Sequence, residues 1–278
     1  MALRIKTNVA SINVQRNMTI TNRNLQQSLE RLSTGYRINK AADDAAGFAV
    51  ANSFKAKIAS LRVAYQNATE SNSMLQVADG AFQEIEKILV RMKQLATQAA
   101  GDQITNTERG LLQTEFFELQ NELDRIAQTS KYNGVTLIYS TAVDAKTSFT
   151  FQIGAQNLPY DQLRVDIDAV STAALKVNDI DIKGLASAQA AMDAIDTALT
   201  SINNYMSKLG AYQNRLQHTM DNLNVMIENY SASESAIRDA DMALEVTKFT
   251  KNQILQQAGM AMLAQANAAP QQILTLLR

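Results

Sequence analysis

The sequence predicts a mainly α fold, in which long helices from both ends of the chain pack as antiparallel coiled coils with a small β insert between them. Three observations lead to this prediction. The 278 residues include no Trp, only two Pro and 6% aromatic residues, a composition typical of long packed helices. Apolar residues recur every seven positions in both halves of the chain. Between the halves, the apolar spacing changes to two.

The first half predicts a short helix, a turn and one very long helix. The N-terminal segment is amphipathic up to residues 33–35, and Gly35 can turn the chain where that helix ends. Residues 44–100 contain no proline, and the glycines within them are isolated. One helix over this range would be about 85 Å long at about 1.5 Å per residue. Its seven-residue apolar row consists of Leu61, Ala68, Leu75, Phe82, Leu89 and Ala96.

A third helix and a β insert follow. The stretch "TNTERG" is a helix-capping signal, with Thr105 or Thr107 as the N-cap. Asn133-Gly134 predicts a turn that ends the helical pattern. Apolar and polar residues alternate in "FTFQI" and "LRVDID", and "GAQNLPYDQ" between them supplies turn residues. This pattern predicts an antiparallel hairpin within an insert at about residues 135–182.

The second half predicts a long helix that returns along the first. Its main apolar row consists of Ile195, Ile202, Leu209, Leu216, Leu223, Tyr230, Ile237 and Leu244. The companion row is formed by Met192, Leu199, Met206, Met220 and Ile227. Gln213 interrupts this companion row, as polar residues do where they fix the register of a coiled coil. Neither half can bury its apolar stripe alone, so we expect the N- and C-terminal segments to lie side by side.

The sequence offers little for catalysis or for binding metals and cofactors. Its single histidine, His218, lies off both apolar rows, and without Cys or a second His no zinc or iron site is expected. The acidic pairs Asp43–Asp44 and Asp239–Asp241 lie in Ala-rich helical sequence without aromatic neighbours. An acid/base pair needs two unlike environments facing a cleft, so helix capping by Asp43 or Asp44 is the favoured interpretation. We therefore expect no enzyme activity and no cofactor.

Charge and hydropathy argue against two further classes of protein. The chain has 26 Lys and Arg against 27 Asp and Glu, whereas a nucleic-acid binder usually carries a basic stripe. No run of eighteen apolar residues is present, so membrane insertion is not expected. The N-terminus lacks the apolar core of a cleaved signal peptide. That absence indicates a cytoplasmic protein by default, although export routes that cleave no signal leave no such trace.

Both ends of the chain carry apolar stripes that short helices cannot bury in a single copy. The residues concerned are Met18, Leu25, Leu29, Leu32, Ile254, Leu255, Met260, Leu263, Leu274 and Leu277. Exposed stripes indicate a partner, and another copy of the chain is the first choice because every copy has the same faces. A head-to-tail contact that does not close produces a helical filament. We therefore interpret these residues as a polymerisation interface.

Several longer stretches resemble the bacterial flagellin family. They are "ERLSTGYRINKAADDAAGFAVAN", "NELDRIAQTSKYNGVTLI", "FQIGA", "LGAYQNRL", "ENYSASESAIRDADMALE", "ILQQAGMAMLAQAN" and "PQQILTLL". Together they cover both ends and both seams. The chain looks like a short form that lacks the variable outer domains of the family, because only the β insert separates its halves.

This resemblance implies a D0/D1-type fold and a structural, self-assembling role. Residues 1–43 and 236–278 would form the inner-tube helices, and residues 44–235 the outer-shell bundle with its β insert. The function implied is that of a subunit of the extracellular flagellar filament used for swimming motility, exported through a type III channel without a cleaved signal. The partners implied are other copies of the chain, the flagellar cap and hook–filament junction proteins, and an export chaperone.

Two alternatives to a filament subunit remain at the level of sequence. A hook–filament junction protein of the same apparatus shares the terminal helices but forms one short ring. A coiled-coil binding module would instead form a stable oligomer of defined size. Filament growth of indefinite length distinguishes a filament subunit from both.

Two finer hypotheses concern particular residues. The family is read by a Toll-like immune receptor, and Arg91, Leu95 and Glu115 match the positions that it contacts. Lys93 and Gln94 depart from the family pattern, and this counts against recognition because Arg and Lys are not equivalent in bidentate contacts. The alternative interpretation is that Leu95 is packed and that Arg91 and Glu115 form a solvated pair.

The second hypothesis concerns the joint between the inner and outer shells. It assigns this joint to Gly35, Arg37, Asp43, Asp44, Arg238, Asp239 and Asp241. There we expect an ionic seam that joins one of the two arginines to one of the two acidic pairs.

Overall fold

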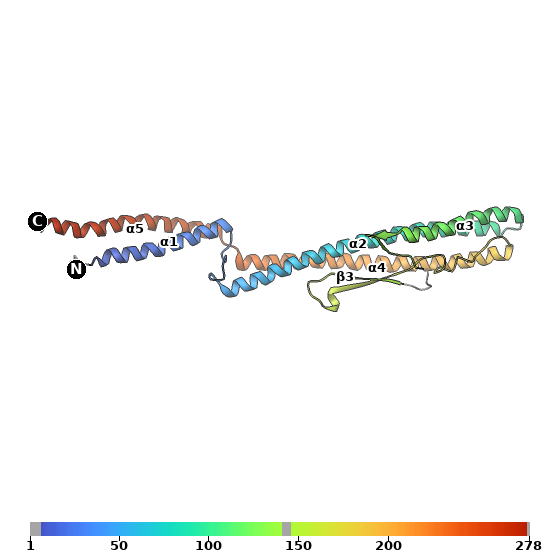
Figure 1. The fold of residues 1–278 in the computed structure, drawn as a ribbon, viewed down its shortest axis with the longest axis horizontal. Coiled ribbons are helices and arrows are strands. Elements are labelled where there is room, and N and C mark those ends of the chain that lie inside the picture. Colours follow the sequence, from blue (N-terminus) through green and yellow to red (C-terminus); the bar gives the residue numbers. More distant parts are fainter. Residues whose placement is uncertain (1–6, 141–145, 277–278) are drawn as a thin grey trace. The chain divides into compact units, whose positions relative to one another are not determined.

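The computed structural model describes residues 7–140 and 146–276. In chain order they form α1 (Val9–Thr34), α2 (Ala45–Ala99), α3 (Asn106–Thr129), β1 (Lys131–Tyr132), β2 (Val135–Thr136), β3 (Lys146–Gln152), the 3₁₀ turn η1 (Pro159–Asp161), β4 (Gln162–Asp168), α4 (Leu185–Arg238) and α5 (Met242–Leu276) (Figure 1). The chain divides into two compact units. We call Met1–Ile58 with Asn229–Arg278 the terminal unit, and Ala59–Glu228 the middle unit.

In the terminal unit, α1 and α5 run antiparallel and side by side (Figure 1). The Gln256 side chain donates to Asn22 Oδ1 at 2.9 Å, and the Ser28 hydroxyl donates to Glu245 at 2.8 Å, so residue numbers rise along α1 as they fall along α5. α1 ends where predicted, because Gly35 adopts a left-handed φ of 76° and its N–H returns to the Arg31 carbonyl at 2.8 Å. The expected meeting of the two ends of the chain is therefore confirmed.

In the middle unit, α2, α3, α4 and the hairpin share one apolar core. All six residues of the α2 row are buried, with at most 2% of any side chain exposed. The ring centres of Phe82 on α2 and Tyr205 on α4 lie 6.3 Å apart, and most of the buried row of each helix belongs to the same core. The coiled-coil prediction is confirmed here because the heptad spacing keeps the same face of each helix toward its partner.

The C-terminal seam is shorter than the sequence pattern predicts. Its row is buried from Ile195 to Leu223, but Leu244 is 53% exposed. The helix α4 ends at Arg238 and α5 begins at Met242, so the break in the helix changes the phase of the repeat. The prediction that the row continues to Leu244 was wrong for this reason.

The start of α3 and the β insert follow local signals closely. Thr105 is the N-cap of α3 and forms a reciprocal capping box with Glu108, while Thr107 lies inside the helix. Asn133 and Gly134 have φ values of 48° and 80°, as the turn between β1 and β2 requires. The hairpin pairs β3 with β4 antiparallel from Lys146↔Asp168 to Gln152↔Gln162.

Residues 169–184 lack strands and are held instead by polar side chains of α3. The Asp124 carboxylate accepts from the N–H of Thr172 at 2.8 Å and from its hydroxyl at 2.7 Å. Further along the same segment, the N–H of Ile182 donates to Gln113 Oε1 at 2.7 Å. These bonds satisfy backbone groups that a regular sheet would otherwise pair.

Candidate functional site

The joint is built from the segment after α1 and the segment between α4 and α5. The N–H of Arg37 donates to the Arg238 carbonyl at 2.7 Å, and the N–H of Ala240 donates to the Gly35 carbonyl at 2.9 Å. Tyr36 and Asp239 therefore pair as an isolated antiparallel bridge. The two stretches, about 200 residues apart in the sequence, are joined by main-chain hydrogen bonds.

The four aspartates of the joint bind nearby groups rather than one another. Asp44 Oδ1 accepts from the N–H of Gly47 at 3.0 Å and caps α2, and Asp241 Oδ1 accepts from the N–H of Leu244 at 3.1 Å and caps α5. The Lys40 N–H lowers the pKa of Asp43, and hydrogen bonds from Asn39 and Gln27 add to this effect. Asp239 accepts from the Ser235 hydroxyl at 2.5 Å. The structure therefore supports helix capping for Asp44 and Asp241, whereas Asp43 and Asp239 accept from groups that precede them in the chain.

The expected ionic seam is wrong. Among the described residues, no ion pair joins Arg37 or Arg238 to the aspartates of the joint. Arg37 donates from Nη2 to the Ile237 carbonyl at 2.6 Å. Arg238 pairs with Glu234 at 3.7 Å, and its guanidinium lies 4.3 Å from the centre of the Tyr36 ring. The arginines are thus engaged by a carbonyl and an aromatic face, while the aspartates are occupied by local donors.

The terminal apolar residues separate into two sets. Met18, Leu25, Leu32 and Leu263 are half-buried within the single chain. Gly259 provides space for one of them, because a Cβ at residue 259 would lie 2.9 Å from Met18 Cγ. The exposed set consists of Leu29, Ile254, Leu255 and Met260, with 54%, 59%, 46% and 51% of each residue exposed. The other two predicted residues, Leu274 and Leu277, lie outside the residues whose side chains are described.

A buried polar cluster between α1 and α5 was not predicted from the sequence. Glu245 is 4% exposed, and its carboxylate accepts from the Ser28 hydroxyl at 2.8 Å and from Lys248 Nζ at 3.1 Å. Arg31 Nη1 lies 3.9 Å away from the same carboxylate. Burial acts to raise the pKa of Glu245, but the hydrogen bonds and the two cations together lower it. The i,i+3 spacing of Glu245 and Lys248 could have predicted their ion pair. No local signal could have predicted that Ser28, far away in the sequence, donates to the same carboxylate.

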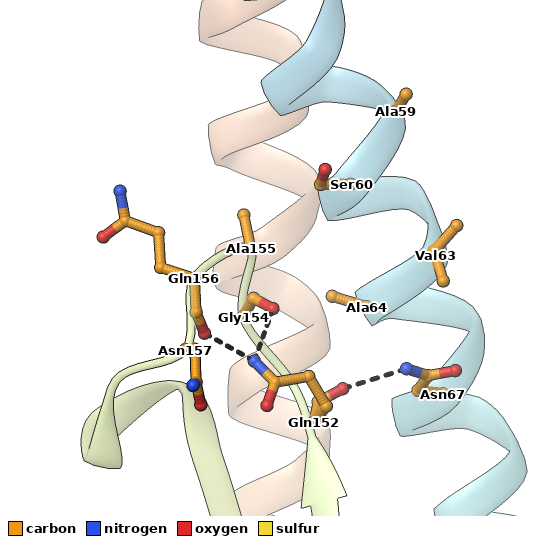
Figure 2. Close-up of a pocket in the computed structure, with 10 residues that line it drawn as sticks. All are labelled: Ala59, Ser60, Val63, Ala64, Asn67, Gln152, Gly154, Ala155, Gln156 and Asn157. Atoms are coloured by element: carbon orange, nitrogen blue, oxygen red, sulfur yellow. Dashed lines mark hydrogen bonds between the residues drawn. The ribbon is translucent and has the colours of Figure 1, made fainter.

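One hollow lies in the middle unit, where the loop after β3 approaches α2 (Figure 2). It has a volume of about 630 Å³ and is lined by small and amide side chains, none of them ionisable. Asn67 donates to the Gln152 carbonyl at 3.1 Å, and the Gln152 side chain donates to the carbonyls of Gly154 and Gln156 (Figure 2). The bond from Asn67 ties the loop to α2. The lining has one hydroxyl, that of Ser60, but no acid or base that could activate it.

The three residues matched to receptor contacts lie on α2 and α3 but differ in exposure. Arg91 Nη2 and Glu115 Oε1 are 2.7 Å apart, and both side chains are about half exposed. Leu95 is 1% exposed and belongs to the core of the middle unit. In the single chain, Arg91 and Glu115 thus form a solvated pair and Leu95 is packed. This matches the alternative interpretation of the stretch, which needs no receptor.

Residues 7–140 and 146–276 offer neither a cluster of metal ligands nor a membrane-spanning helix. In these ranges no group of three or more His, Asp or Glu side chains is arranged to hold a metal ion. His218 is exposed on α4. None of the described helices combines the length and the hydropathy needed to cross a membrane.

Comparison with known proteins identifies both ends of the chain. The model of the bacterial flagellin N-terminal helical region matches residues 5–142, and that of the C-terminal helical region matches residues 192–277. The chain is 42% identical to a flagellin of Halalkalibacterium halodurans over 99% of each sequence. It is 39% identical to a flagellin of Bacillus subtilis over 99% of this chain and 100% of that protein. The crystal structure of Bacillus cereus flagellin superposes with a TM-score of 0.50 and 29% identity, over 57% of this chain and 88% of that one.

Proposed function

The chain belongs to the bacterial flagellin family, and from this premise we propose that α1 and α5 make its principal polymer contacts. The protein is a structural subunit that self-assembles into the extracellular flagellar filament, and it is not an enzyme. A junction protein and a coiled-coil binding module are not favoured, because the matched relatives are flagellins over their full length.

The observation that carries the proposal is the exposed apolar set of Leu29, Ile254, Leu255 and Met260. Each of these residues is about half exposed in the single chain, although each lies on a helix that already packs against another. Covering such side chains with a second copy removes apolar surface from water, at about 25 cal/mol per Å². Repeated head to tail, the contact extends without limit and gives a filament.

We further propose that the chain is layered in the filament. Residues 1–43 and 236–278 would form the inner tube and residues 44–235 the outer shell. The joint residues Gly35, Arg37, Asp43, Asp44, Arg238, Asp239 and Asp241 would connect the two layers. Main-chain bonding between the two stretches of the joint supports this role, because it holds the outgoing and returning segments in register.

Seeded polymerisation of the full chain tests the assembly proposal. Ile254→Gln and Met260→Gln each place an amide on the exposed set, and we expect the critical concentration for growth to rise several-fold. Val77→Gln is the matched control, because Val77 is 42% exposed on α2 and lies in the middle unit. An equal effect of the control would mean that the terminal helices are not the principal contact. Removal of residues 236–278 should abolish growth.

Further partners follow from the same premise. We propose that the chain is exported without a cleaved signal, with an export chaperone, and meets the flagellar cap and hook–filament junction proteins at the ends of the filament. A Toll-like immune receptor would contact Arg91 and Glu115, the two exposed residues of the matched set. Leu95 would contribute only by supporting the α2 surface from within. Binding of the receptor ectodomain to Glu115→Ala, compared with Glu118→Ala on the same helix, tests this contact.

A further inference from the structure

The polar cluster around Glu245 forms one wall of a groove between α1 and α5. The groove has a volume of about 250 Å³ and lies wholly in the terminal unit. Its ionisable lining consists of three cations, Arg31, Lys248 and Lys251, and one carboxylate, Glu245. The groove therefore holds an excess of two positive charges.

The single carboxylate does not satisfy the three cations. Glu245 already accepts from Ser28 and Lys248, and it lies 3.9 Å from Arg31 Nη1, beyond hydrogen-bond distance. Arg31 Nε is buried and has no hydrogen-bond partner. Within the described residues, the side-chain ammonium of Lys251 takes part in no hydrogen bond or ion pair. A buried donor without an acceptor is costly. Since Nε itself is closed to solvent, a further acceptor would meet the part of the Arg31 side chain that is still exposed, which is 20%.

The distribution of charge along the chain indicates where such an acceptor comes from. The terminal unit has 13 Lys and Arg against 7 Asp and Glu, and the middle unit has 13 against 20. Their net charges are therefore +6 and −7, although the whole chain carries only −1. Glu70 and Glu118 are examples of exposed carboxylates that form no ion pair among the described residues of the middle unit.

We propose that the groove of Arg31, Lys248 and Lys251 binds a carboxylate side chain from the acidic middle unit of a second copy. The inference rests on the proposed self-assembly and adds an electrostatic contact to its apolar one. A carboxylate fits the planar guanidinium of Arg31 and would be shared with the flexible Lys251 ammonium. Complementary charge between copies also fixes the register of docking, which apolar contact alone leaves loose.

Lys251→Gln tests the proposal with little risk to folding, because Lys251 is exposed and removing its charge breaks no internal bond of the described chain. We expect the critical concentration for seeded growth to rise about three- to tenfold at low salt, and Lys251→Arg to restore it. The difference from the native chain should shrink as NaCl is added, because exposed charges are screened. Lys55→Gln is the matched control, since Lys55 is an exposed, unpaired lysine of the same unit outside the groove. We expect it to change growth by less than about twofold.

The outcomes separate this contact from its alternatives. Equal effects of Lys251→Gln and Lys55→Gln would mean that only overall charge matters, and the groove would have no special role. A second arm titrates inorganic phosphate into the monomer and compares phosphate with chloride at equal ionic strength during growth. Phosphate that binds the groove and inhibits growth supports the proposal. Phosphate binding combined with normal growth of Lys251→Gln would make the groove a site for free anions and overturn it. Failure of the native chain itself to polymerise would refute the assembly proposal instead.

Discussion

The side-chain amide of Asn8 donates to the main-chain carbonyl of Ala266 at 2.8 Å. In an α-helix this carbonyl would accept from the residue four positions later, but that residue is Pro270, which has no N–H. The same Asn8 side chain accepts from the N–H of Ser11 at 3.1 Å and caps α1. The Asn8 side chain therefore caps the start of α1 and also replaces the main-chain hydrogen bond that Pro270 removes from α5.

Asn8→Ala should loosen both terminal helices at once. We expect it to destabilise the pairing of α1 with α5 by about 1–2 kcal/mol, because a helix cap and a hydrogen bond are both lost. Hydrogen exchange of the amides in the C-terminal half of α5 measures the effect. Asn17→Ala, at an exposed position of α1, is the control and should leave these amides protected. In a Pro270→Ala background the cost of Asn8→Ala should fall, since the helix then satisfies Ala266 itself.

Glu245→Gln should weaken the terminal unit and flatten its dependence on pH. The pKa of Glu245 is lowered in the folded chain, so its stabilising effect is present above the ordinary value of 4.5 and is lost as the pH falls through the folded value. At neutral pH we expect a loss of about 1–3 kcal/mol, because charged hydrogen bonds to Ser28 and Lys248 disappear. Urea unfolding measured across the acid range provides the comparison. A variant whose stability falls with acid as steeply as that of the native chain would contradict the assignment.

Leu75→Ala should destabilise the middle unit by about 2–5 kcal/mol, because Leu75 is fully buried in the α2 row and its removal leaves a cavity. Val77→Ala, two residues along the same helix, is the control, because Val77 is 42% exposed. We expect the control to stay within about 0.5 kcal/mol of the native chain. Thermal unfolding followed by far-UV circular dichroism distinguishes the two, and similar midpoints would contradict the burial of the seam.

Thr105→Ala should cost about 1 kcal/mol, because it removes the hydroxyl that accepts from the N–H of Glu108 at the start of α3. The neighbouring Thr107→Ala removes an exposed hydroxyl within the helix and should change stability by less than about 0.5 kcal/mol. The pair separates the two caps that the sequence allowed. A larger loss of stability for Thr107→Ala than for Thr105→Ala would contradict the assignment of Thr105 as the cap.

Local signals in the sequence were enough for most helices and for the hairpin. The seven-residue rows predicted the buried faces of α2 and α4 because helix periodicity fixes which side chains share a face. Asn133-Gly134 correctly predicted a turn, and Asp44 correctly predicted a helix cap. Both features depend on only a few adjacent residues. The row failed at Leu244, where a break in the helix that the apolar pattern does not mark shifts its phase.

The sequence by itself thus determined the helices, their buried faces, the caps and the family of the chain. Only the tertiary structure decided which terminal side chains remain exposed, how the joint is held and where the unsatisfied charge lies. The sequence predicted an ionic seam, but in the structure Arg37 donates to the Ile237 carbonyl and Arg238 packs against the Tyr36 ring. Such choices depend on donors and acceptors that lie hundreds of residues apart in the sequence, as Asn8 and Ala266 do. Periodicity and capping act within a few residues, so they contain no information about these distant partners.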